Sequence, residues 1–307
     1  MKEIAKKPLW LRKKIFYSEE NLGLYRLIKE KGIHTVCEEA RCPNRSECYH
    51  DKTATFLILG RICTRSCQFC SVESMSENLR DTLAPPDPQE AIRVAEMVDI
   101  LGLDYVVLTS VTRDDLSDGG ARHFARSVRA VKGLERSVLV EVLTPDFKAD
   151  KDSIKLVMSS EPDVYNHNIE TVERLSPVIR RQGGYRLSLS VLETVKTMRP
   201  DMMTKSGILV GLGESREEMI RLFQDLKSVG CDILTIGQYL QPTRRNIAVR
   251  EYVSEETFAE YESEARDIGI AVVQSLPYAR SSYRARESYI SRQKALDNNK
   301  DKLNLKE

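Results

Sequence analysis

Short β-branched segments alternate with longer segments of helical periodicity from residue 53 to residue 276 of this 307-residue chain. Such alternation is typical of a parallel sheet whose neighbouring strands are connected by helices. The expected strands are Thr53–Leu59, Tyr105–Thr109, Val138–Leu143, Val164–Asn166, Ser206–Val210 and Ile233–Gly237, with Ala271–Ser275 as a candidate last strand. The expected helices are Pro88–Leu101, Ala121–Lys132, Lys151–Ser159, Leu189–Met198, Glu217–Val229 and Glu255–Ile268.

Six such strand–helix units are fewer than the eight that close a TIM barrel. The sequence therefore predicts an α/β fold, an open partial (β/α)6 TIM-like barrel over residues 53–276. Residues 1–52 form an N-terminal extension with a helix expected at Leu22–Lys31, and residues 277–307 form a C-terminal extension. The polar and charged residues 287–307 predict a disordered tail.

Three cysteines follow the first expected strand. Cys63, Cys67 and Cys70, here called the cysteine loop, form a C-x3-C-x2-C pattern with the aromatic Phe69 before the last cysteine. Three thiolates at this spacing suit a [4Fe–4S] cluster with one iron left without a protein ligand. The loop leaves the carboxyl end of a strand, the face where βα barrels keep their chemistry. A zinc site with a fourth ligand elsewhere is the alternative, but zinc sites usually pair two C-x2-C-like segments.

A second group of three cysteines lies in the N-terminal extension. Cys37, Cys42 and Cys48, here called the upstream triad, have the pattern C-x4-C-x5-C. Alone, they would also suit a structural zinc or three free thiols, but a neighbouring cluster site favours a second iron–sulfur cluster. The remaining cysteine, Cys231, precedes a strand and is interpreted as a small buried hydrophobic residue.

The overall composition argues against several other classes of protein. The net charge is +1 at pH 7, so the charge balance gives no support for a nucleic-acid partner. No apolar run approaches the roughly 18 residues of a membrane-spanning helix, and the basic N-terminus lacks the apolar core of a secretory signal. The seven cysteines are an odd number, which argues against a disulfide framework and favours metal ligation in a reducing compartment. We therefore expect a cytoplasmic protein without a nucleic-acid or membrane partner.

The cysteine loop, with its aromatic residue, resembles the signature of the radical S-adenosylmethionine (SAM) superfamily. Together, the two cysteine groups and the segment Arg280-Ser281-Ser282-Tyr283, here called the serine turn, resemble the lipoyl synthase family. The resemblance runs from about residue 30 to residue 286. Other segments that agree with it are Leu108–Leu116, Asp118–Ala121, Tyr165–Thr171, Lys205–Gly207, Gly211–Glu214 and Gly237–Pro242.

This resemblance implies an activity, cofactors and partners. An enzyme of the family inserts two sulfur atoms at carbons 6 and 8 of an octanoyl group that is amide-linked to a lysine of a lipoyl carrier protein. The implied carrier is the glycine-cleavage H protein or the lipoyl domain of a 2-oxoacid dehydrogenase. The implied cofactors are SAM and two [4Fe–4S] clusters, one of which, the auxiliary cluster, donates the sulfur. Ferredoxin or flavodoxin is the implied source of electrons.

The resemblance also assigns roles to individual residues. It makes Cys63, Cys67 and Cys70 ligands of the SAM-binding cluster. For the auxiliary cluster it implies the ligands Cys37, Cys42, Cys48 and Ser282, and it makes Ser282 a catalytic residue. An oxygen ligand is less suited than a thiolate to cluster iron, so it would let that iron leave a sacrificial cluster. Without the family, Ser281 and Ser282 would be interpreted as a turn or a helix cap.

Contacts to SAM are expected at loops that follow the strands. Backbone and hydroxyl groups at Thr109 and Ser110 are expected to bind the methionine end of SAM, and Asn168 and Glu170 its ribose hydroxyls. Gly211 would allow the backbone to approach the adenine closely. A further set of acids is equally compatible with a ligand role and with solvated loop charge or helix capping. They are Asp114, Asp115 and Glu214.

Three other functions compete with this interpretation. A biotin synthase-like sulfur-inserting enzyme would carry its auxiliary ligands inside the barrel, not in an N-terminal extension. A non-catalytic electron-transfer protein would normally bind each cluster with four cysteines, and this chain cannot supply eight. A zinc-dependent nucleic-acid module is disfavoured by the near-neutral charge and by the cysteine spacing.

Overall fold

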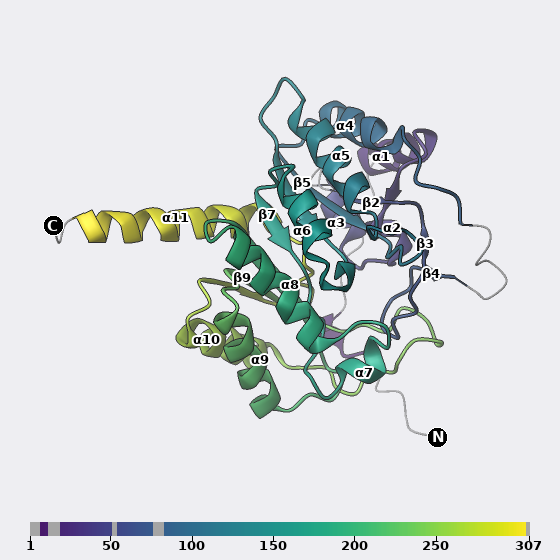
Figure 1. Ribbon diagram of the computed structural model, residues 1–307. Helices are drawn as coiled ribbons and strands as arrows, with labels where there is room; N and C mark the ends of the chain where they lie inside the picture. Colours follow the sequence, from purple (N-terminus) through teal and green to yellow (C-terminus); the bar gives the residue numbers. More distant parts are fainter. Residues whose placement is uncertain (1–6, 12–18, 51–53, 76–82, 305–307) are drawn as a thin grey trace.

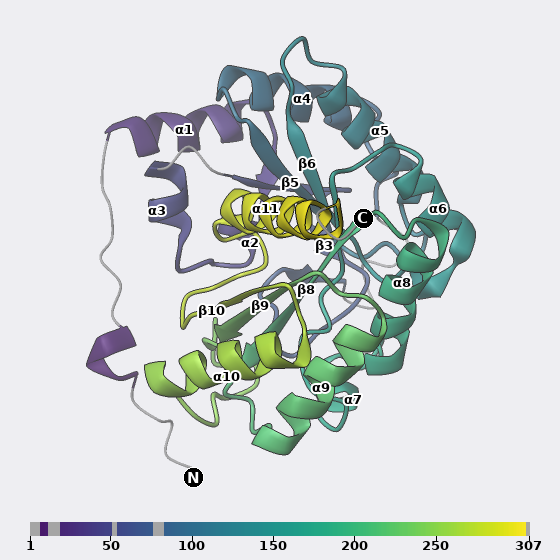
Figure 2. The same cartoon turned by 90° about the vertical axis from the view of Figure 1, so that its left-hand side faces the viewer.

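The structure is a computed structural model that describes residues 7–11, 19–50, 54–75 and 83–304. Its centre is a curved sheet of eight strands with helices on the outer side (Figure 1 and Figure 2). In order across the sheet the strands are β1 (His34–Thr35), β2 (Thr55–Ile58), β5 (Tyr105–Ser110), β6 (Leu139–Leu143), β7 (Val164–Asn166), β8 (Met203–Val210), β9 (Ile233–Gln238) and β10 (Val272–Ser275).

The sheet is an open partial barrel, as predicted. β1 pairs antiparallel with β2, and the other neighbouring strands pair in parallel. In the described part of the chain β1 and β10 each have one neighbour, so the sheet does not close. The connecting helices are α4 (Glu90–Ile100), α5 (Ala121–Lys132), α6 (Lys151–Met158), α8 (Tyr185–Met198), α9 (Arg216–Ser228) and α10 (Glu255–Ile268). Most expected elements are found within about three residues of their expected ends; Thr53, the expected start of the first strand, lies outside the described residues.

The core lies between the strands and these outer helices. In α5, Phe124, Val128 and Val131 recur at helical spacing and are fully buried. Burial of each such side chain contributes roughly 1.5–3 kcal/mol. The packed core holds the strands in place, so their carboxyl ends form a firm rim for the loops that follow them.

The strand β8 begins at Met203, three residues before the expected start at Ser206, and its first half contains a lysine. Lys205 is 1% exposed, and its ammonium group lies 3.1 Å from the carboxylate of Glu141 on β6. A charged residue in an expected core position argues against a strand, but here the barrel interior supplies the opposite charge.

Shorter elements complete the N-terminal extension and the loops. The expected helix at Leu22–Lys31 is present as α1 (Glu19–Glu30). The others are η1 (Leu9–Leu11), α2 (Val36–Glu39), α3 (Arg45–His50), β3 (Ile62–Cys63), β4 (Glu73–Ser74), η3 (Phe147–Ala149) and α7 (Ser176–Ile179). The extension also contributes β1 to the main sheet; the boundaries at residues 52 and 276 stay predictions.

The expectation of a disordered tail is wrong for residues 287–304. These residues belong to α11 (Ala285–Asn304), the yellow helix that projects from the molecule in Figure 1. The Tyr289 ring packs on Tyr105, with 6.2 Å between centroids, and the Arg292 guanidinium donates to Asp232 at 2.7 and 3.0 Å. Tyr289 also contacts the first residues of several strands, so α11 covers the amino end of the barrel. Two anchors of this kind can order a polar helix that its composition alone would not stabilise. Within the described ranges, no helix has the length and apolar character needed to cross a membrane.

Candidate functional site

The cysteine loop lies at the carboxyl end of β2, as predicted. Cys63 lies in β3, and the side chains of all three cysteines are half-buried free thiols. Burial, together with the nearby thiol of Cys63, raises the pKa of Cys67 to about 11. Burial, together with the other two thiols, raises the pKa of Cys70 to about 12. The three sulfur atoms therefore share one partly desolvated space.

Backbone amides point at two of these sulfur atoms. The N–H groups of Arg65 and Thr112 each donate to the Cys63 Sγ at 3.4 Å, and the Val72 N–H donates to the Cys70 Sγ at 3.4 Å. Hydrogen bonds to ligand sulfurs help to set the reduction potential of an iron–sulfur cluster. The donor set therefore fits such a cluster.

Neighbouring loops hold the cysteine loop on both sides. The N–H groups of Thr64 and Gln68 donate to the carbonyls of Thr112 and Ile179, both at 2.9 Å. The Asn246 side chain donates to the Cys70 carbonyl at 2.7 Å. Phe69, the aromatic residue of the motif, packs against a cluster of Ile179, Leu212, Tyr239 and Val249.

The cysteine loop offers three thiols as possible ligands. Among the described residues, no three His, Cys, Asp or Glu side chains converge as ligands of one ion. A [4Fe–4S] cluster does not need that convergence, because each thiolate binds a different iron. Cys63, Cys67 and Cys70 could therefore hold such a cluster and leave its fourth iron free for SAM.

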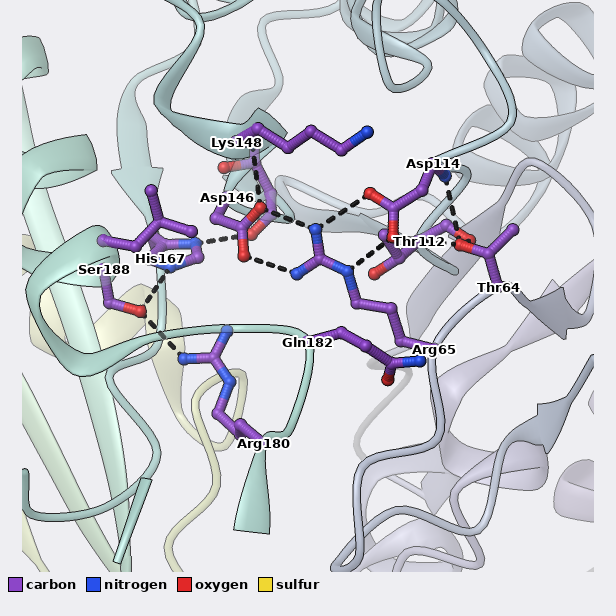
Figure 3. A network of polar contacts seen from close by, with 12 residues as sticks. Thr64, Arg65, Thr112, Asp114, Asp146, Lys148, His167, Arg180, Gln182 and Ser188 are labelled. Carbon is purple, nitrogen blue, oxygen red and sulfur yellow. Dashed lines mark hydrogen bonds and ion pairs between the residues drawn. The ribbon is translucent and has the colours of Figure 1, made fainter. Parts of the chain in front are cut away.

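Sequence reasoning missed a buried ion network beside these thiols, drawn in Figure 3. Arg65, which lies between the first two cysteines of the loop, pairs with Asp114 and Asp146. Burial alone would lower the pKa of Arg65 and raise that of Asp146, but the hydrogen bonds of Arg65 to Asp114 and Asp146 reverse both directions. Both groups therefore stay charged. The one available signal was an arginine inside the cysteine motif; its partners come from other strands, so spacing does not reveal them.

A second missed group continues this network. His167 lies at the end of β7 with its Nδ1 2.9 Å from the Thr144 carbonyl and its Nε2 3.0 Å from the Ser188 hydroxyl (Figure 3). Burial, and then the nearby Arg180, lower the pKa of His167 to about 4. A neutral ring that donates from Nδ1 and accepts at Nε2 fits both contacts. Arg180 donates to the same Ser188 oxygen at 2.8 Å.

The two hydroxyl residues expected to bind SAM differ in their contacts. Thr109 is buried at the end of β5 and its hydroxyl donates to the Leu143 carbonyl at 2.8 Å. Its side chain is thus already used by the sheet. The neighbouring Ser110 Oγ is shielded from solvent and has no hydrogen-bond partner among the described residues. A buried hydroxyl without a partner fits a polar ligand.

Asn168 and Glu170 form one unit after β7. The Asn168 amide donates to the Glu170 carboxylate at 3.1 Å. Glu170 has a left-handed backbone with φ of 69°, and burial raises the pKa of its carboxyl group. Strained backbone at a non-glycine residue is concentrated at functional sites. The arrangement is compatible with the predicted ribose contacts, which stay a prediction.

Gly211 is required by the protein itself. Its φ is +89°, and a Cβ there would lie 2.2 Å from the Gln238 amide and 2.3 Å from the Glu251 carbonyl. These close approaches account for the glycine without a ligand. Contact with adenine at Gly211 stays a prediction.

Asp114, Asp115 and Glu214, which the sequence left between a ligand role and a structural one, all accept hydrogen bonds within the protein. Asp114 accepts from Arg65, and Asp115 accepts from Arg113 at 2.7 Å. Glu214 accepts from the backbone N–H groups of Gly211 and Leu212. These contacts give all three a structural role in their loops.

The upstream triad and the serine turn lie against each other. The Asn44 amide donates to the Tyr278 carbonyl at 2.7 Å, and the Tyr283 hydroxyl donates to Glu47 at 2.8 Å. Burial, and then the nearby Cys42, raise the pKa of Cys37 to about 12. Two segments more than 200 residues apart in sequence thus lie against each other, while their role as ligands of one cluster stays a prediction.

Ser282 lies half-buried in the middle of this turn. Ser281, before it, donates to the Asn168 side chain at 2.8 Å. Tyr283, after it, is bonded to Glu47, next to Cys48. Ser282 is therefore held between the barrel interior and the upstream triad. Arg280, whose pKa is lowered by burial, lies near both Cys42 and Glu170.

Comparison with known proteins identifies relatives of this chain. Residues 57–226 match the model of the radical SAM superfamily. The lipoyl synthase of Alkaliphilus metalliredigens is 48% identical over 285 residues, which cover 93% of this chain and 96% of that protein. The lipoyl synthase of Caldicellulosiruptor saccharolyticus is 48% identical over 284 residues, covering 92% and 98%.

Solved structures support the fold. Methylornithine synthase superposes with a TM-score of 0.52 at 14% identity, covering 88% of this chain and 84% of that one. Streptococcus suis SuiB superposes with a TM-score of 0.53 at 11% identity, covering 86% and 56%. At such low identity, the likeness concerns the partial barrel alone.

Proposed function

Because the chain belongs to the lipoyl synthase family of the radical SAM superfamily, we propose that it converts a protein-bound octanoyl group into the lipoyl cofactor. The reaction inserts sulfur at carbons 6 and 8 of the octanoyl chain. The observation that carries this proposal is the contact between the serine turn and the upstream triad through Tyr283 and Glu47. That contact brings the serine turn against the upstream triad and so supports the assignment of Ser282 to a second ligand set.

The two ligand sets divide the work. When bound, SAM and its cluster supply the radical that removes hydrogen from the substrate, and the auxiliary cluster supplies the sulfur. Cys63, Cys67 and Cys70 hold the first cluster at the strand ends. The upstream triad and Ser282 hold the second, with Ser282 as the weakly binding oxygen ligand. In this proposal Ser110, Asn168 and Glu170 contact SAM, and the surrounding loops exclude water.

The location of the upstream triad favours this family over a biotin synthase-like enzyme. In the latter, the auxiliary ligands would lie inside the barrel. Here Cys37 lies in α2 of the N-terminal extension, before β2, the first parallel strand of the barrel. The alternative of an electron-transfer protein does not explain the buried polar groups around the cysteine loop.

The substrate is an octanoylated lipoyl carrier protein. We expect the carrier to be the glycine-cleavage H protein or a lipoyl domain of a 2-oxoacid dehydrogenase, and the reductant to be ferredoxin or flavodoxin. We also expect the enzyme to work in the cytoplasm.

The test uses anaerobically reconstituted protein, whose clusters are first counted by iron and sulfide analysis and Mössbauer spectroscopy. It is then given SAM, dithionite and octanoylated H protein. Mass spectrometry should show a carrier in which two C–H bonds have become C–SH bonds, so that it has gained two sulfur atoms without a net loss of hydrogen, together with 5′-deoxyadenosine. An octanoylated carrier that stays unchanged while 5′-deoxyadenosine forms would contradict sulfur insertion.

A further inference from the structure

Arg65 lies inside the cysteine loop but makes its ionic contacts outside it (Figure 3). Its Nε and Nη2 donate to Asp114 at 2.7 and 2.9 Å, and its Nη1 and Nη2 donate to Asp146 at 2.5 and 2.8 Å. Asp114 lies in the loop after β5, and Asp146 in the loop after β6. One guanidinium group thus ties the cysteine loop to the ends of two strands.

The contact of Arg65 with Asp114 and Asp146 is here called the Arg65 clamp. It is largely buried, so forming it costs hydration free energy. The side chains of Arg65 and Asp146 are 6% and 0% exposed. Buried ion pairs often stabilise a fold no better than apolar side chains of the same size, because the charges lose their hydration. General stability is therefore a poor explanation for this group. Fixed geometry is a better one, because a guanidinium that is held by two carboxylates can occupy few positions.

The turn that presents Asp146 is strained. Phe147, Lys148 and Ala149 have φ values of 45°, 54° and 55°, and none is a glycine. Each left-handed residue of this kind costs on the order of 1 kcal/mol or more. The strain is offset locally: Asp146 accepts from the Lys148 N–H at 2.9 Å, and the Phe147 ring packs edge-on against Phe124. Strain that persists under such constraint suggests that the direction of the Asp146 carboxylate matters.

We propose that Arg65 is a positioning residue, which fixes the cysteine loop relative to the strand ends where SAM binds. This inference rests on the proposed function. Cys63 and Cys67 flank Arg65 in sequence, while Ser110 is the last residue of β5 and Asn168 follows β7. The clamp therefore sets the distance between the cluster and the residues expected to hold SAM. Misplacement of a reacting group by about 1 Å can cost on the order of a hundredfold in rate.

The test compares Arg65→Lys with Arg292→Lys. Lysine keeps the positive charge but cannot hold two carboxylates as a planar fork. Arg292 is a matched control, because its guanidinium also makes two hydrogen bonds to a carboxylate but lies on α11, at the other end of the barrel. Asp114→Asn is a second variant; the Asp114 side chain is 28% exposed, so the change should allow folding.

The first readout needs no cluster. In the unloaded protein, hydrogen–deuterium exchange reports the amides of Ser66 and Gln68, which donate to Gln182 and Ile179. We expect Arg65→Lys and Asp114→Asn to speed exchange in the cysteine loop, and Arg292→Lys to leave it unchanged. Exchange rates equal to those of the wild type in both variants would contradict the proposal that Arg65 fixes the cysteine loop. This readout tests whether Arg65 fixes the loop, and it does so even if the proposed function is wrong.

The second readout is the number of 5′-deoxyadenosine molecules formed for each sulfur atom inserted. Both products are normalised to the amount of cluster bound. A badly placed cluster should form radicals that miss the substrate, so this ratio should rise several-fold in Arg65→Lys and not in Arg292→Lys. Faster exchange with an unchanged ratio would leave Arg65 a purely structural role and overturn the proposal. A wild-type protein that forms no lipoyl product would instead contradict the proposed function.

Discussion

The two candidate cluster sites are built in opposite ways. The cysteine loop is one continuous segment at the strand ends, held by backbone amides, by the loops around Thr112 and Ile179, and by the buried Arg65 clamp. The site around the upstream triad is assembled from the two ends of the chain, which meet through hydrogen bonds such as Tyr283 to Glu47. The first site belongs to the most constrained part of the fold. The second depends on contacts between distant segments.

This difference matches the two proposed chemical roles. A site that is held together by a few contacts between distant segments opens locally at lower free energy than barrel strands do. A cluster that only passes electrons must survive every turnover, whereas a cluster that gives up sulfur must come apart and be rebuilt. Under the proposed function, the permanent cluster would be held at the strand ends of the barrel and the consumable one between the N-terminal and C-terminal extensions.

The largest effect should follow from removing the cysteine loop thiols. Wild-type protein should hold about eight irons as two [4Fe–4S] clusters. Replacing Cys63, Cys67 and Cys70 together by Ala should leave one cluster and abolish formation of 5′-deoxyadenosine, measured by chromatography. Cys231→Ala is the control. This thiol is buried just before β9, at the amino end of the barrel, and should not bind iron. A triple variant that still cleaves SAM would show that the open iron lies elsewhere.

Removing the upstream triad should separate the two activities. Replacing Cys37, Cys42 and Cys48 by Ala should spare reductive cleavage of SAM but eliminate sulfur insertion, because the barrel site does not depend on the chain ends. Both products are quantified in one mass-spectrometric experiment, after circular dichroism has shown that the variant is folded. Loss of both activities in a folded variant would mean that the two sites are not independent.

Ser282 tests whether the second site must be labile. A thiolate binds cluster iron more tightly than an alkoxide does. Ser282→Cys should therefore keep the auxiliary cluster but slow or block sulfur transfer in single-turnover assays, with iron content checked beforehand. Ser281→Ala, which removes the hydrogen bond to Asn168, should be much milder. A wild-type yield of dithiol product from Ser282→Cys would show that lability of this ligand is not needed.

The barrel and the cysteine motifs could be predicted because they depend on local patterns. Periodicity located α5 and α10, and spacing identified both cysteine groups. The Arg65 clamp, His167 and the anchors of α11 could not be predicted, because each depends on a partner brought close by the fold. Composition predicted disorder for residues 287–307, but it could not reveal that Tyr289 and Arg292 have partners at the amino end of the barrel.

Acid should lower the free energy of unfolding of the barrel. The pKa of His167 falls from 6.5 to about 4 on folding. Between these pH values the unfolded chain binds a proton that the folded protein does not. The contribution of His167 to the free energy of unfolding is therefore fully present above pH 6.5 and is lost as the pH drops towards 4. The effect should be on the order of 3 kcal/mol. Denaturant titrations of the unloaded protein at several pH values measure it, and His167→Asn should flatten this part of the profile. An unchanged profile would mean that other groups dominate acid sensitivity.

The smallest effect should come from loosening the contact between the chain ends without touching a ligand. Tyr283→Phe removes the hydroxyl that donates to Glu47 at 2.8 Å. The loss of one such hydrogen bond costs about 1 kcal/mol, which corresponds to a roughly fivefold change in an equilibrium. Iron should therefore leave the auxiliary cluster a few-fold faster when a chelator is added, while the cluster of the cysteine loop is unaffected. Tyr289→Phe is the matched control, because its hydroxyl accepts from Gln293 at the opposite end of the barrel. Equal iron release from wild type and Tyr283→Phe would mean that other contacts hold the chain ends together, and that the auxiliary site owes its lability to the Ser282 ligand alone.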